Sequence, residues 1–460
     1  MYKRWIFALL AACGLFLIAT QAGAQLPSNP KARTPPAIPT ITANVRNVLV
    51  PVLVTNKKGH PISDLQRSDF TVFEDGVRQQ ILGFSKTYSV SLDSFNLPRS
   101  GGRHASPPAK IGPNSPIRNY LVCVDTLHSN LGNVTGARRG LTKFFRKEND
   151  PRAQYALVIL SRKIEVIQGA TRDPSAILSA LKSKKFQSGV ADGEASNIAS
   201  QEDQLLRMLT GVSPQACRGR NACSKVKRQV RGYIDNSANR TALLTRDFLR
   251  ELTTIINAMA SMPTERTLIL ISDGFTLAPG EELYGIASAY FPDDPEWQIN
   301  PRQTQPMLDE ILQLAEKDNV VVYGLDSRGV YTPSSSEILG ASHGVTDGHN
   351  TQMDSRNTSF QASIQGMQTM MTNEAAIAYQ NGSALAQLAS ATGGIYFENN
   401  NRLLPGLQRA FNDERVRYLI AYSPSNQTAD GHYRKIRVAV KGKNLRVYAK
   451  AGYWAPGAAR

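Results

Sequence analysis

The sequence predicts an α/β protein with a mostly parallel central sheet, framed by β-rich segments. Between residues 118 and 414, apolar runs of strand length alternate with amphipathic helical stretches. That pattern is typical of a mostly parallel, Rossmann-like sheet with helices on both faces. Residues 41–90 and 415–456 instead alternate polar and apolar side chains with period two, as half-buried antiparallel strands do. We expect these two segments to pack together as one smaller, sandwich-like domain; two separate β-units are the alternative.

The first 24 residues have the features of a secretory signal peptide. Basic residues precede an apolar run that ends near Ala19, and Ala22-Gly23-Ala24 supplies small residues for cleavage. We therefore expect an exported protein, in the periplasm or outside the cell. A lipoprotein anchor at Cys13 is a minor alternative, because Leu10-Ala11-Ala12-Cys13 resembles a lipoprotein cleavage box. No later stretch is apolar enough for a membrane span, so none is expected in the mature protein.

Two linkers separate the predicted domains. Residues 25–40 are rich in proline, and residues 91–117 are rich in serine, proline and glycine, compositions that do not form a core. Between these linkers, Asp75-Gly76 joins two alternating runs. That dipeptide predicts a tight β-hairpin.

The α/β region is predicted element by element from its periodicity. Strands are expected over residues 120–125, 155–161, 163–168, 267–271, 320–325 and 394–397. Helices are expected over residues 135–146, after 171–174, and over 241–262, 306–317, 383–390 and 404–413. Residues 186–235 are expected to be a polar insertion with some helix, and residues 330–380 a long exposed excursion.

The cysteines fit an oxidising compartment. Cys217 and Cys223 bracket a short basic loop, and in an exported protein we expect them to form a local disulfide. Cys123 lies inside an apolar strand and is expected to be a buried hydrophobic residue. The cysteine and histidine spacings match no zinc motif.

Three predicted strands end in carboxylates: Asp125, Asp273 and Asp326. The carboxyl ends of parallel strands lie at one edge of a sheet, where ligands of open α/β sheets bind. Carboxylates with hydroxyls and water suit a hard cation such as Mg²⁺ or Ca²⁺. Turn formation and capping explain the same residues equally well, so both interpretations stay open on this pattern alone.

The order of these motifs resembles a von Willebrand factor A (VWA) domain. The resemblance rests on D-T-L-H-S at 125–129, S-D-G at 272–274 and L-A-S-A-T-G-G before the last strand. It implies a metal-ion-dependent adhesion site for Mg²⁺, or Ca²⁺ or Mn²⁺, with Asp125, Ser129 and Asp273 as ligands. Leu127 stands where the motif has a ligand serine, so the implied site is degenerate.

The threonine ligand that the resemblance implies has no position fixed by a motif. Its candidates are Ser196, Ser200, Thr210 and Thr241. With an oxygen missing at residue 127, the resemblance allows either weak metal binding or a scaffold without metal, in which Asp125 serves only as a hydrogen-bond acceptor.

A wider set of motifs is similar to the VWFA-related acidobacterial domain family of exported bacterial proteins. The motifs are D-F-T-V-F-E-D-G-V-R-Q-Q-I at 69–81, I-S-D-G-F at 271–275, Y-G-L-D-S-R-G-V at 323–330, L-A-S-A-T-G-G at 388–394 and K-A-G-Y-W at 450–454. The resemblance covers residues 41–456 and implies a VWA domain framed by β-strands.

The sequence favours a binding protein over an enzyme. G-A-S-H-G at 340–344 matches the nucleophile elbow of serine hydrolases, but no apolar strand precedes Ser342 and no helix pattern follows it. His128 has no accompanying nucleophile and is expected to be a surface loop residue. A secreted serine hydrolase is therefore the remote alternative.

The expected function is recognition of a protein or cell-surface ligand, with no enzymatic activity. A metal-independent structural or assembly component of the cell envelope is the alternative. The net charge of +16 favours anionic partners, but the basic residues are scattered and an exported protein is not expected to bind nucleic acid.

Overall fold

A computed structural model describes most of the folded chain. The described residues are 47–86, 118–191, 196–209, 212, 216–218, 222–262, 265–291, 294, 297, 304–329, 382–398 and 403–457. The predicted signal peptide, both predicted linkers, and the excursion at 330–380 with Ser342 lie outside them. Among the described residues, no helix combines the length and apolar character needed to cross a membrane.

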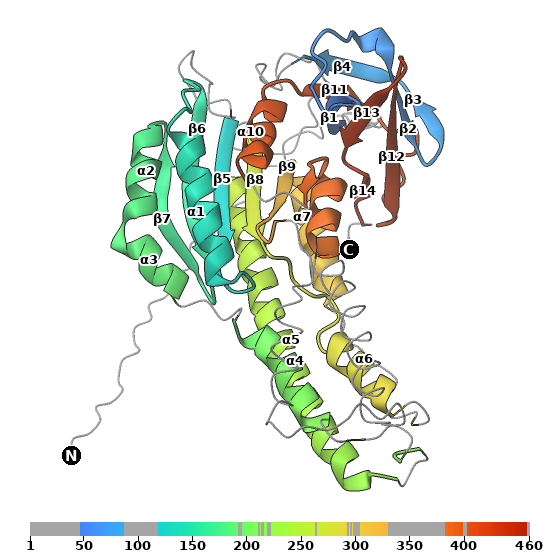
Figure 1. Ribbon diagram of the computed structural model, residues 1–460. Helices are drawn as coiled ribbons and strands as arrows, with labels where there is room; N and C mark the ends of the chain where they lie inside the picture. Colours follow the sequence, from blue (N-terminus) through green and yellow to red (C-terminus); the bar gives the residue numbers. More distant parts are fainter. Residues whose placement is uncertain are drawn as a thin grey trace, which may run out of the picture. The chain divides into compact units, whose positions relative to one another are not determined.

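A six-stranded sheet forms the centre of the fold (Figure 1). Its strands are β5 (Arg118–Asp125), β6 (Ala153–Leu160), β7 (Ile164–Thr171), β8 (Glu265–Ser272), β9 (Val320–Asp326) and β10 (Tyr396–Phe397). They lie in the order β10-β9-β8-β5-β6-β7, with β7 antiparallel to β6 and every other pair parallel. The predicted fold class, an α/β protein with a mostly parallel central sheet, is confirmed.

Helices cover both faces of this sheet, which explains why its strands read as continuous apolar runs. One face packs against α1 (Leu131–Phe145), α2 (Pro174–Lys182), α3 (Lys184–Ala191) and α10 (Leu403–Glu414). The other packs against the C-terminal half of α5 (Ser224–Ala260), α7 (Gln305–Lys317) and a helix over residues 382–392. Along β5, Tyr120, Val122 and Val124 join the first core, and Leu121 and Cys123 join the second.

The two ends of the chain build a β-sandwich together. One sheet has the order β13-β1-β11-β4 and the other β14-β12-β2-β3. Their strands are β1 (Val48–Asn56), β2 (Phe70–Glu74), β3 (Val77–Gln79), β4 (Ile81–Ser85), β11 (Tyr418–Tyr422), β12 (Tyr433–Val440), β13 (Leu445–Ala449) and β14 (Gly452–Trp454); a 3-10 turn, η1 (Arg67–Asp69), precedes β2. Strands from the two flanking segments pair directly, as predicted.

The hairpin between β2 and β3 has its predicted turn. Asp75 and Gly76 have φ angles of 47° and 85°, the left-handed conformation that a tight two-residue hairpin requires and that glycine adopts without strain. Glu74 pairs with Val77 across it.

A continuous core joins the sandwich to the central domain. Leu53 on β1 and Tyr448 on β13 pair directly and both pack against the α1–α10 face of the central sheet. Between α10 and β11, the buried Arg417 donates to Glu414 at 2.6 Å and to the hydroxyl of Tyr323 on β9 at 2.8 Å. These contacts fix where the chain leaves one domain and enters the other.

A helical arm differs most from the sequence prediction. Helix α5 begins at Ser224, inside the predicted insertion, rather than at Thr241, and α6 (Glu281–Tyr290) was not predicted. The N-terminal half of α5 packs with α4 (Ser196–Leu209) and α6 (Figure 1). Their shared core contains Leu205, Leu209, Val230, Ile234, Leu283, Ile286, Phe291 and Trp297. Only a narrow apolar stripe on the N-terminal half of α5 faces this core. The remaining positions are polar, so the sequence shows little helical periodicity there.

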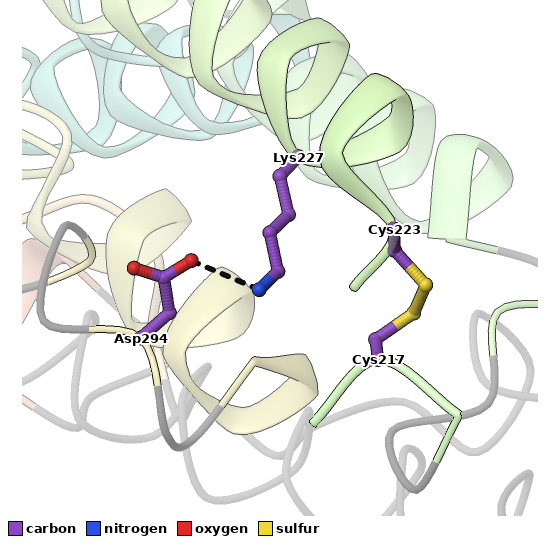
Figure 2. Close-up of a disulfide and its surroundings, with 4 residues drawn as sticks. All are labelled: Cys217, Cys223, Lys227 and Asp294. Carbon is purple, nitrogen blue, oxygen red and sulfur yellow. Dashed lines mark ion pairs between the residues drawn. A yellow bond between two sulfur atoms is a disulfide. The ribbon is translucent and has the colours of Figure 1, made fainter. Parts of the chain in front are cut away.

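Two cross-links hold the end of the arm. Cys217 and Cys223 form a disulfide, with Cα atoms 5.2 Å apart. Nearby, the largely buried Lys227 and Asp294 form an ion pair of 3.0 Å (Figure 2). Cys123 is free and buried in β5.

Candidate functional site

The site lies where the strand order of the central sheet reverses. From β5 the chain continues to β6 on one side, and returns later as β8 on the other side of β5. Open α/β sheets bind ligands outside the carboxyl ends of the strands at such a switch point. Asp125 is the last residue of β5, and Asp273 directly follows β8.

Asp125 is fully buried and accepts hydrogen bonds on both carboxylate oxygens. Oδ1 accepts from the backbone N–H groups of Leu127 at 2.9 Å and His128 at 3.1 Å. Oδ2 accepts from Ser272 Oγ at 2.6 Å and faces His128 Nδ1 at 3.1 Å. A carboxylate has about four acceptor sites, so these four contacts saturate it.

His128 is buried, which corrects the expectation of a surface loop residue. Its side chain is 3% exposed. The ring packs edge-on against Phe248 of α5, with centroids 4.9 Å apart, and against Phe275 at 5.8 Å. Nδ1 faces the Asp125 carboxylate, so the tautomer with the proton on Nδ1 is the one that donates to it. Among the residues that the structure describes, Nε2 is buried without a hydrogen-bond partner.

Asp273 ties β8 to the start of α1 and to the end of β9. Its Oδ2 accepts from Asn130 N at 3.0 Å and from Asn133 Nδ2 at 2.8 Å, and its Oδ1 accepts from Ser327 Oγ at 2.6 Å. Burial raises the pKa of the Asp273 carboxyl, and these hydrogen bonds oppose the rise. The Asp273 amide in turn donates to Ser129 Oγ at 2.9 Å.

Asp326, the third predicted carboxylate, lies at the same sheet edge but has its own partners. Arg328 binds it through Nε at 3.0 Å and through Nη2 at 2.7 Å. The hydroxyl of Tyr396 donates to Oδ2 at 3.1 Å. Ser327 connects this group to Asp273, so one hydrogen-bonded network extends over the ends of β5, β8 and β9.

This arrangement does not fit a directly coordinated cation. Ser129 and Asp273 are neighbours, as the VWA resemblance implies, but their oxygens serve as acceptors for protein N–H and O–H groups. Leu127 is 1% exposed and packs in the apolar core on the α5 side of the sheet. Within the described ranges, no three His, Cys, Asp or Glu side chains are grouped so that they could hold a metal ion.

The candidates for the threonine ligand remain unassigned. Thr241 is buried on α5, Ser196 and Ser200 lie in α4, and Thr210 lies outside the described residues.

Sequence reasoning missed the donors that complete the network. Ser272 and Ser327 directly follow or lie close to predicted strand ends, and the serine of S-D-G was a usable local signal. Asn133 lies in the first turn of α1. Asn130 could also be found, since it is the N-cap of α1 and accepts from Asn133 N at 2.8 Å. The convergence of these residues depends on strand order, which no local pattern encodes.

Comparisons with known proteins add little to this picture. No protein-family model matches the sequence, and no curated protein matches it. A solved aerotolerance-related membrane protein from Bacteroides fragilis is 11% identical with a TM-score of 0.27, covering 65% of this chain and 98% of its own. The conserved hypothetical protein BatB from Bacteroides thetaiotaomicron is 12% identical with a TM-score of 0.24, over 65% and 98%.

The vWF domain of the type V pili tip protein Mfa5 from Porphyromonas gingivalis is 9% identical, with a TM-score of 0.22 over 58% of this chain and 94% of its own. TM-scores this low carry no argument. The fold therefore rests on the strand order and helix layers described above, and the family resemblance drawn from the sequence stays a prediction.

Proposed function

We propose that this chain is an exported, non-enzymatic protein-binding module that recognises a partner at the β5–β8 edge of its VWA-type sheet without a metal ion. The saturation of Asp125 carries the proposal. Its four acceptor contacts already supply what a bound cation would otherwise provide for a buried carboxylate. To bind a cation directly, the site would have to break these contacts and leave buried donors unpaired, which is costly.

An exposed apolar residue lies beside this rigid network. Leu131, the first residue of α1, is 66% exposed. It follows Asn130, whose backbone N–H is bonded to Asp273. A large apolar side chain on an immobilised backbone is a good anchor for a protein partner, because little entropy is lost when the partner covers it.

The proposed compartment follows from the cysteines and the leader sequence. Disulfides persist in oxidising compartments, and Cys217 and Cys223 are joined. A partner in the periplasm or on the cell surface fits this environment. A role in envelope assembly would use the same surface in the same way.

The test is capture of partners from the envelope fraction of the producing cells, with EDTA present. Wild-type protein is compared with Leu131→Asp, and with Leu243→Asp as a matched control, since Leu243 is 58% exposed on α5. A partner retained by the wild type and the control but lost with Leu131→Asp supports the proposal. Equal retention by both variants, or retention only when Mg²⁺ is added, contradicts it.

A further inference from the structure

A second candidate binding surface lies on the β-sandwich, away from the residues of the proposed recognition edge. A hollow of about 860 Å³ opens between η1, β2 and the β3–β4 segment. Its polar lining consists of Gln66, Arg67, Ser68, Thr71, Arg78, Gln79 and Gln80. Ligand pockets typically measure roughly 300–1,000 Å³, so the hollow has the size of a ligand site.

The hollow is lined by two arginines and by no acidic residue. Arg67 and Arg78 are both exposed, and within the part of the chain that the structure describes neither pairs with a carboxylate. The nearest acid along the chain, Asp69, is engaged in accepting from the Gln66 backbone at 2.8 Å. The two guanidinium groups are thus available to an anionic ligand.

The backbone holds the Arg67 side chain in place, and the strand register sets the face on which Arg78 lies. Arg67 donates from Nη2 to the carbonyl of Ile81, which directs its side chain across the hollow towards β4. Arg78 lies opposite Phe73 in the β2–β3 pair. Because Arg67 is bonded in this way, it loses less entropy when it binds a carboxylate than a free surface side chain does.

The positive charge continues across the outer face of the same sheet. Phe73 pairs with Arg78 on one side and with Arg437 of β12 on the other, so the three side chains share a face. The Arg437 guanidinium lies 4.0 Å from the Phe73 ring centroid, a cation–π contact. Lys435, two residues before Arg437, points to the same face and is exposed. The hollow is therefore one end of a basic row.

We propose that this hollow and row bind an acidic polysaccharide through its carboxylate groups. Guanidinium groups bind carboxylates in a bidentate manner. The amides of Gln66 and Gln80 and the hydroxyls of Ser68 and Thr71 match sugar hydroxyls. A stacked nucleic acid would require open aromatic faces, whereas Arg437 covers Phe73. An anionic bilayer is flat, whereas these arginines line a concave surface.

The experiment is isothermal titration of the full mature chain with a tri-uronate, at two salt concentrations. A neutral trisaccharide, anionic phospholipid vesicles and single-stranded DNA are tested alongside. The variant is Arg67→Gln/Arg78→Gln. The matched control is Lys225→Gln/Arg246→Gln, which removes the same charge from the exposed face of α5. Arg78→Gln alone is included because Arg67 also bonds the backbone, and melting curves check that each variant is folded.

The proposal predicts saturable uronate binding that weakens with salt. The double variant lowers the affinity about tenfold or more, as expected for two lost charge-assisted contacts, and Arg78→Gln lowers it in part. The control stays within about twofold of the wild type. If the variant and the control lose the same affinity for the uronate, the binding is non-specific charge attraction and the proposal is overturned. It is also overturned if the uronate does not bind, if the neutral sugar binds equally well, or if only vesicles or DNA bind.

Discussion

Replacing Asp125 separates a hydrogen-bonding role from a metal-binding role. In Asp125→Ala, the backbone N–H groups of Leu127 and His128 lose their acceptor, and so does the hydroxyl of Ser272. Each buried donor left unpaired costs about 1–3 kcal/mol. With partial relaxation of the loop, we expect a total loss of about 3–5 kcal/mol.

Asp125→Asn removes the charge but keeps the shape. The amide oxygen can still accept the two backbone N–H groups, while the amide nitrogen faces Ser272 and His128. A hydroxyl can rotate and an imidazole can change tautomer so that both accept. The expected loss is therefore about 1 kcal/mol.

The assay is thermal unfolding in EDTA, followed by circular dichroism. At about 2–4 °C per kcal/mol for a domain of this size, Asp125→Ala should melt roughly 10 °C below the wild type and Asp125→Asn within about 4 °C of it. Asp247→Ala is the control, because this carboxylate forms only a surface pair of 2.8 Å with Arg250. If Asp125→Asn is as unstable as Asp125→Ala, the negative charge itself is required and the reasoning fails.

Three further predictions follow from single features of the structure. Leu127→Ser should lower stability by about 3–5 kcal/mol, because it leaves a cavity and a buried hydroxyl in the core on the α5 side; an unchanged melting temperature would contradict this packing. Reducing the Cys217–Cys223 bond, or replacing both residues by serine, should destabilise the arm by about 2 kcal/mol, since the bond closes a short loop. Faster proteolysis within α5, with the central sheet intact, is the expected readout. Burial raises the pKa of Asp413 to about 7, above its ordinary value of 3.8. The folded state therefore binds the extra proton, and unfolding free energy should fall as pH rises from about 4 to 7. Asp413→Asn should flatten that fall, and an unchanged pH profile in urea titrations would refute the assignment.

The sequence predicted the structure best where one requirement, burial against a neighbouring layer, applies to a whole run of residues. The runs at 120–125, 267–271 and 320–325 are apolar because both faces of the sheet are covered by helices, and each became a strand. The period-two segments at both ends of the chain likewise became paired strands, because a sandwich buries one face of each sheet.

The helices of the arm and the burial of His128 were harder to predict, because they depend on contacts with distant parts of the chain. The first half of α5 packs against the small core that it shares with α4 and α6, so most of its surface is polar and its period is weak. Helix α6 was within reach, since Leu283, Ile286 and Ala287 share one face after an acidic first turn. His128 shows most clearly that local sequence cannot predict burial by a distant residue. A histidine after a strand usually lies at the surface, and its burial depends on Phe248, 120 positions along the chain.

The most direct test of the central claim is titration of Mg²⁺ and Mn²⁺ into EDTA-treated mature protein, by calorimetry and by thermal shift. A site with a dissociation constant of about 100 μM would stabilise the fold by about 2.7 kcal/mol at 10 mM metal, which either method detects. The saturation of Asp125 predicts no saturable heat and no shift in melting temperature. Stoichiometric binding that disappears in Asp125→Ala would show instead that the D-T-L-H-S turn holds a metal, despite Leu127.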